Sequence, residues 1–138
     1  MQASRRTVIE PEGIPAPAGQ YSEAIRARGG HFLFIAGQVA QNSKGEIIGK
    51  GDAEAQTRQV FTNLGLILKS AGASFRDVVE FTTYLVGVES VRPFLKARSE
   101  LFVDLYPNAD YPANTLINIE SLGGSDALVE IKAVAVLP

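Results

Sequence analysis

The residues that could do chemistry in this chain are few, and two of them stand in its last two strand-like runs. Asn114 lies in the run over residues 111–120 and Glu130 in the run over residues 127–137. A carboxylate can act as a general base, and an amide can bind a polar group. Because β-branched residues alternate on both sides of a short Gly-Gly-Ser-Asp link, we expect an antiparallel hairpin that brings Asn114 and Glu130 into one sheet.

Other kinds of active site have little support in the sequence. The chain has no cysteine, which excludes disulfides, thiolate metal sites and a cysteine nucleophile. His31 is the single histidine and follows Gly29-Gly30, a position typical of a turn or surface residue. The serines lack the Gly-x-Ser-x-Gly context of a hydrolase nucleophile. Scattered carboxylates and one histidine form no ligand-spaced cluster, so we expect no metal and no cofactor.

Composition indicates one globular domain over residues 1–138, since 46% of the 138 residues are hydrophobic. The formal charge of −2 arises from interspersed acidic and basic residues, so nucleic acid is not expected as a partner. The first residues lack a signal-peptide pattern, and no run approaches the about 20 apolar residues of a membrane span. These features, with the absence of cysteine, are compatible with a cytoplasmic protein without a membrane partner.

The pattern of elements predicts an α+β fold. Strands are expected over residues 6–10, 21–28, 31–39 and 77–86, with 31–39 as a central strand and Gly29-Gly30 as a hairpin turn before it. Asp52 is expected to cap a long helix that ends at Gly72, and Ser90 to cap a second helix. With the two C-terminal strands, the economical packing is a mixed sheet with two helices on one face.

The two C-terminal strands each have two different sides. The period of two puts Thr115, Ile117 and Ile119 on one side of the first, and Val129, Ile131, Ala133 and Ala135 on one side of the second. We expect these apolar sides to face the core. The opposite sides mix Asn114, Leu116, Glu130 and Lys132, which is too apolar for open water, so a closed symmetric oligomer is expected to cover them.

Several segments, in the same order along the chain, resemble the RidA/YjgF/UK114 (Rid) family. The resemblance runs nearly end to end and is carried by residues 18–24, 33–39, 56–64, 71–79, 111–115 and 128–136. It implies a chorismate-mutase-like α+β fold, a homotrimer with ligand clefts between subunits, and hydrolysis of reactive enamines and imines to ketoacids and ammonia.

The resemblance also implies roles for individual residues. Glu130 corresponds to a carboxylate that positions water, and Tyr21 to an aromatic residue that lines the cleft. Gly37 and Leu116 correspond to positions where backbone groups approach the ligand. For Glu130 the alternative is a solvated strand residue or one paired with Lys132 of a neighbouring subunit, and for Tyr21 it is a packing role in the core or at an interface.

Two positions depart from the family pattern. Asn114 stands where hydrolytic members carry an arginine that holds the substrate carboxylate, and Ala36 stands where a serine or threonine is common. An amide has neither the permanent charge nor the two-pronged donor geometry of a guanidinium, so Asn114 predicts poor activity on carboxylate-bearing imines. Another arginine could supply the charge, but no spacing argument selects one among Arg26, Arg28, Arg58, Arg92 and Arg98.

Three functions therefore remain open. The first is a deaminase that hydrolyses a small imine or enamine at intersubunit clefts, with Glu130 and Asn114 as catalytic residues and Tyr21, Ala36, Gly37 and Leu116 as ligand-binding residues. The second is a non-catalytic homotrimer that binds a small molecule. Endoribonuclease activity is the third and has the least support, because no cluster of base-stacking aromatic residues accompanies the Lys and Arg residues.

Overall fold

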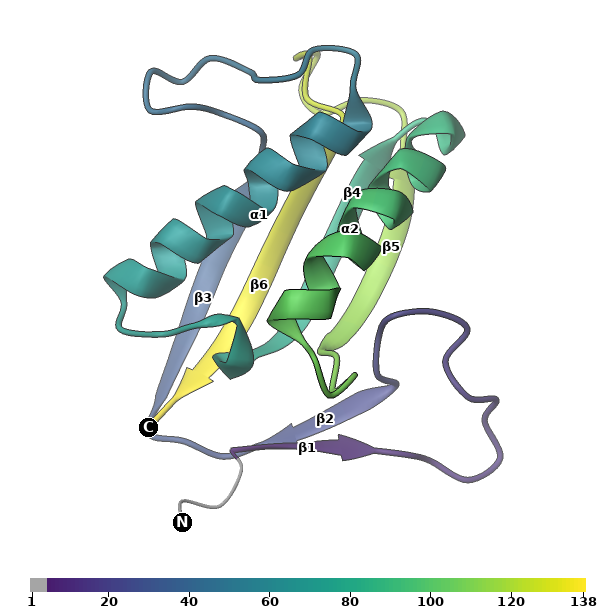
Figure 1. Ribbon diagram of the computed structural model, residues 1–138, viewed down its shortest axis with the longest axis vertical. Helices are drawn as coiled ribbons and strands as arrows, with labels where there is room; N and C mark the ends of the chain where they lie inside the picture. The colour runs from purple at the N-terminus through teal and green to yellow at the C-terminus, as the bar shows by residue number, and fades with distance from the viewer. Residues whose placement is uncertain (1–4) are drawn as a thin grey trace.

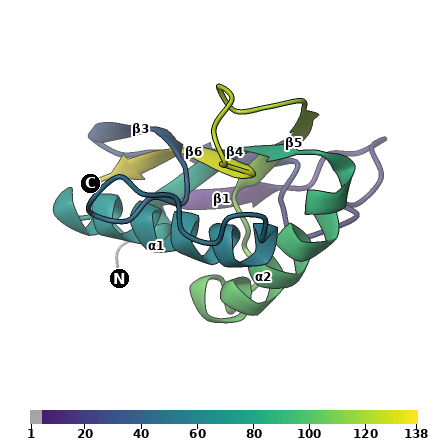
Figure 2. The same ribbon diagram turned by 90° about the horizontal axis from the view of Figure 1, so that it is seen from above.

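The computed structural model describes residues 5–138, in which two helices lie against one face of a four-stranded sheet (Figures 1 and 2). The strand order is β3-β6-β4-β5, with β6 antiparallel to both β3 and β4, and β4 parallel to β5. These elements are β3 (His31–Gln38), α1 (Ala53–Ser70), β4 (Val78–Val86), α2 (Val91–Leu105), β5 (Ala113–Ile119) and β6 (Val129–Leu137).

A second, two-stranded antiparallel sheet is formed by β1 (Arg6–Ile9) and β2 (Ala24–Ala27). Two short 3-10 turns, η1 (Phe75–Asp77) and η2 (Val88–Ser90), precede β4 and α2. The predicted α+β class, mixed sheet and one-sided helix layer are confirmed. In the part of the chain that the structure describes, no helix has both the length and the apolar character needed to cross a membrane.

The predicted hairpin between the last two strands is wrong, because β4 lies between β5 and β6. The chain passes from β4 through α2 to β5, and a helix that packs back on the sheet in such a connection places the next strand parallel to the first. Asn114 is consequently opposite Phe81, and Glu130 is opposite Tyr84. The two residues do share a sheet, as expected, but on strands that are not neighbours.

Two expectations about β3 also fail. This strand is at the edge of the sheet, not its centre, and Gly29-Gly30 is not a hairpin turn because β2 pairs with β1 while β3 pairs with β6. Gly29 lies where the chain leaves one sheet and enters the other. A Cβ at this position would lie 2.2 Å from the backbone oxygen of Leu137, so the close approach of β6 requires glycine.

Local signals correctly located the helix ends. The side chain of Asp52 accepts a hydrogen bond of 3.0 Å from the Ala55 N–H at the start of α1, and Gly72 follows its end with φ of +71°. Ser90 is the residue before α2, but its hydroxyl donates to the Val86 carbonyl at 2.6 Å and does not cap the helix. The predicted capping role of the Ser90 side chain is therefore wrong.

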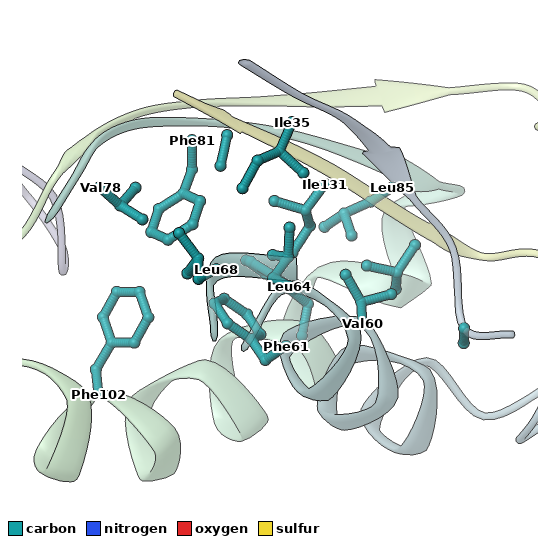
Figure 3. Close-up of a cluster of buried hydrophobic side chains, with 14 of the residues drawn as sticks. Ile35, Val60, Phe61, Leu64, Leu68, Val78, Phe81, Leu85, Phe102 and Ile131 are labelled. Carbon is teal, nitrogen blue, oxygen red and sulfur yellow. The ribbon is translucent and has the colours of Figure 1, made fainter. Parts of the chain in front are cut away.

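The core lies between the helix layer and the sheet (Figure 3). Leu64 of α1 is fully buried, and the neighbouring Phe61 ring lies 5.8 Å from the ring of Phe81 in β4 and 5.7 Å from that of Phe102 in α2. These aromatic contacts join both helices to the sheet. The apolar side of β6 faces this core, as predicted, since Val129, Ile131, Ala133 and Ala135 are all buried.

In β5 the two sides are reversed from the prediction. Asn114 and Leu116 lie on the side of the helices, whereas Ile117 points to the opposite side and is 39% exposed. The cause is the register with β4, which sets Asn114 beside Phe81, a residue of the core face. Because side chains alternate along a strand, that one pairing decides the orientation of the rest of β5.

Candidate functional site

A groove of about 420 Å³ runs along β5 at the outer edge of the sheet. Three of the predicted site residues, Tyr21, Asn114 and Leu116, lie together on its wall. The other lining residues are Ala18, Gly19, Leu95, Arg98 and Thr115. The volume lies within the range of about 300–1,000 Å³ that is usual for small-molecule sites, so the groove can take a small metabolite.

A hydrogen bond from β4 orients the Asn114 side chain on the groove wall. The hydroxyl of Thr83, a residue only 1% exposed, donates a hydrogen bond of 2.9 Å to Asn114 Oδ1. With its oxygen engaged, Asn114 has its Nδ2 amide left to donate to a ligand. A small void of about 10 Å³ adjoins the groove and is lined by Asn114, Thr83, Arg98 and Gln20 together with aromatic rings of the core.

Arg98 is the arginine that the fold brings to Asn114. It lies in α2 with 6% exposure, and its guanidinium carbon is 5.3 Å from the Phe94 ring centre and 5.7 Å from that of Phe102. Burial lowers the pKa of Arg98, while the nearby Tyr111 has the opposite effect. A sequence signal for this residue existed, because Arg98 stands midway between Phe94 and Phe102 at a spacing of four, within the buried stripe of the helix.

Glu130 lies on the other face of the sheet, with Gly37 and Ala36. A Cβ on Gly37 would be 2.6 Å from Glu130 Oε2, so the absence of a side chain at residue 37 makes room for the carboxylate. Ala36 and Gly37 are exposed and Glu130 is half-buried. A β-bulge between Ile35 and Gln38 interrupts the pairing of β3 with β6 at this point, which is a common device for presenting groups to a ligand.

One chain therefore carries the predicted site residues as two separate groups. Tyr21, Asn114 and Leu116 line the groove on the helix side, while Ala36, Gly37 and Glu130 lie on the uncovered side of the sheet. His31, at the start of β3, is exposed and belongs to neither group. Within residues 5–138 no group of three potential metal ligands occurs.

The uncovered side of the sheet is strongly apolar around the Glu130 group. Phe32 and Phe34 of β3 are 66% and 76% exposed, and their rings stack with centroids 6.3 Å apart. In the sheet, Phe32 is opposite Val136 and Phe34 is opposite Val134. Adjacent exposed aromatic residues on a sheet face that no helix covers are typical of a protein interaction surface.

Comparison with known proteins shows the family to which the chain belongs. The model of the Endoribonuclease L-PSP family matches residues 12–137, and the chain belongs to this family. It is 41% identical over 131 residues to a RutC family protein of Pyrococcus horikoshii, an alignment that covers 94% of this chain and 97% of the relative.

Two further relatives extend this similarity to a solved structure and to a protein of named activity. A conserved Rid family protein of Yersinia pestis, YyfB, superposes with a TM-score of 0.84 and 37% identity, covering 96% of this chain and 99% of the other. The 3-aminoacrylate deaminase RutC of Acinetobacter baylyi is 30% identical over 130 residues, covering 94% of this chain and 97% of that protein.

Proposed function

We propose that this protein is a hydrolase that converts a small imine or enamine to a carbonyl compound and ammonia, in clefts formed between the subunits of a homotrimer. The observation that carries the proposal is the division of the candidate site into two incomplete groups on opposite faces of the sheet. A second copy that packs against the uncovered face can bring its own Tyr21, Asn114 and Leu116 to the Ala36, Gly37 and Glu130 of the first copy. The relative named 3-aminoacrylate deaminase acts on an enamine, which supports this reaction class.

In the proposed reaction, Glu130 accepts a proton from a water molecule while the water oxygen bonds to the imine carbon. The C=N double bond becomes a single bond, and its nitrogen takes up a proton. The nitrogen of the resulting carbinolamine takes up a second proton, and the C–N bond breaks as the hydroxyl proton is removed, which releases ammonia and leaves a carbonyl group. An enamine enters the same route after protonation at carbon. Asn114 and the backbone near Gly37 orient the polar ends of the substrate.

The assembly can be tested through Phe34. Replacing Phe34 with Glu puts a charge into the apolar patch that we expect to be buried between subunits, so Phe34→Glu is expected to shift the protein from trimer toward monomer. Light scattering should give three times the 14.8 kDa chain mass for the unaltered protein. Leu66→Glu is the matched control, because Leu66 is 60% exposed on α1 and not on the sheet. A stable monomer of the unaltered protein would contradict the proposal.

The activity is tested by ammonia release from imines generated in situ by an amino-acid oxidase. We expect the purified protein to accelerate release above the spontaneous rate, in proportion to protein concentration. The measurement follows ammonia continuously with a coupled dehydrogenase. An amine oxidase supplies matching imines that have no carboxylate. If neither these nor the alanine-, leucine- and phenylalanine-derived imines are hydrolysed faster than in buffer, the hydrolase assignment is wrong.

Small-molecule binding without catalysis is the second candidate, and one observation favours it. The groove is complete within one chain and does not contain Glu130, so it could bind a ligand without placing any carboxylate next to it. A binder of this kind would retain its ligand in variants that lack Glu130 and would release no ammonia with any imine.

A further inference from the structure

We infer that Arg98 is the anion-binding residue of the groove, and that its ligand carries a carboxylate. This rests on the groove being the ligand site of the proposed function, and it adds the chemical class of the ligand. It also reverses the expectation from Asn114 alone, which is that carboxylate-bearing imines are poor substrates. The argument depends on the burial of Arg98, on its contacts and on the charge of the groove.

Arg98 is a buried cation without a compensating anion. Only 6% of the residue is exposed, its Nε is buried without a hydrogen-bond partner, and no ion pair joins it to any described residue. Buried charges in proteins are normally paired, because removal of a charge from water is costly. The stacking on Phe94 and Phe102 offsets part of this cost but leaves the buried Nε–H without an acceptor.

Arg98 is part of the wall of the ligand groove. Arg98 lines both the groove and the small void beside it, and Asn114 is the other residue that lines both. Its Nη2 atom lies close to Gly19 on the groove wall, where an added Cβ would be 3.7 Å away. This distance places the guanidinium beside the groove wall at residue 19.

The groove has donors but no negative charge. None of its lining residues is acidic, and Asn114 has its amide Nδ2 available because Thr83 binds its oxygen. A planar guanidinium with a neighbouring amide donor matches the two oxygens of a carboxylate. A single guanidinium balances one negative charge, which fits a monocarboxylate better than a dianion.

The other four arginines considered from the sequence do not meet these conditions. Arg58 is already engaged with Glu54 and Glu100. The remaining three are exposed and absent from the groove wall: Arg26, Arg28 and Arg92. Among them, Arg92 lies on the same helix as Arg98 and is therefore a suitable control for loss of one positive charge.

The test measures binding of propanoate and of its neutral isostere propanamide to the intact protein, by ¹⁵N NMR titration. The side-chain Nε–H signal of Arg98 reports on the guanidinium itself. We expect propanoate to shift this signal saturably and propanamide to leave it unchanged. Arg98→Met should weaken propanoate binding at least about tenfold, Arg98→Lys should weaken it less, and Arg92→Met should have no effect.

Three results would overturn the inference: equal binding of propanoate and propanamide, unchanged propanoate affinity in Arg98→Met, or no shift of the Arg98 signal at saturation. The ligand comparison uses the unaltered protein, so the test holds even if Arg98→Met does not fold. Propanoate has no C=N bond to hydrolyse, so a failure to bind it would contradict the inference about Arg98 without testing the hydrolase proposal. Anion binding without ammonia release would leave Arg98 as the anchor of a binding protein.

Discussion

Glu130→Gln is expected to lower the rate of ammonia release by about 10²–10⁴-fold, the usual contribution of a general base. Glutamine has nearly the shape of glutamate but cannot accept a proton from water. The substitution should also fit, since Gly37 leaves the same space for an amide as for the carboxylate. The measurement is the initial rate of ammonia release at saturating imine, compared with the unaltered protein at equal concentration.

The matched control for this variant is Glu80→Gln. Glu80 is an exposed carboxylate of β4, opposite Val134 on the same uncovered side of the sheet. Its loss changes the net charge equally, so it should leave turnover within about twofold. Propanoate should still bind to Glu130→Gln, because the substitution leaves the groove residues Arg98 and Asn114 unchanged. Turnover that survives in Glu130→Gln would remove Glu130 from the mechanism.

Leu64→Ala is expected to reduce the free energy of unfolding by about 2–5 kcal/mol, which is the range for truncation of a fully buried leucine. Leu64 has 0% exposure and lies between α1 and the sheet (Figure 3). The substitution removes buried methyl groups and leaves a cavity that the surrounding aromatic residues cannot close without losing contacts. Urea denaturation followed by circular dichroism measures the change, at one fixed protein concentration because an oligomer unfolds in a concentration-dependent way.

Leu66→Ala provides the comparison within the same helix. It removes the same atoms two residues further along α1, at a side chain that is 60% exposed. Its effect should be within about 0.5 kcal/mol. If the two variants lost equal stability, the burial of α1 against the sheet would be misassigned.

The relation between Arg98 and Asn114 shows why part of the site was hidden in the sequence. The sequence marks each residue separately: Asn114 departs from the family pattern, and Arg98 is one of five arginines that could supply a charge. Their proximity depends on how α2 packs against β5, and residues 16 positions apart on a helix and a strand have no fixed spacing. Thr83, which orients Asn114, comes from a third element, β4.

What the sequence determined by itself was local or periodic. The ends of α1 followed from the capping oxygen of Asp52 and from Gly72, and the buried side of β6 followed from alternation in Val129, Ile131, Ala133 and Ala135. Such signals need only neighbouring residues, and they were sufficient for the α+β class and the helix layer. The family resemblance, confirmed by the match over residues 12–137, came from short segments in order.

The tertiary structure alone decided which strands are neighbours and which side of β5 faces the helices. Hydrophobic alternation specifies that a strand has two faces, but β5 carries aliphatic residues on both, so the pattern could not choose between them. The choice comes from the parallel register with β4, where Asn114 meets Phe81. That single pairing places Asn114 on the side of Arg98 and not on the side of Glu130. The sequence could not predict it, because pairing between strands distant in sequence is a property of the whole packed sheet and not of either strand.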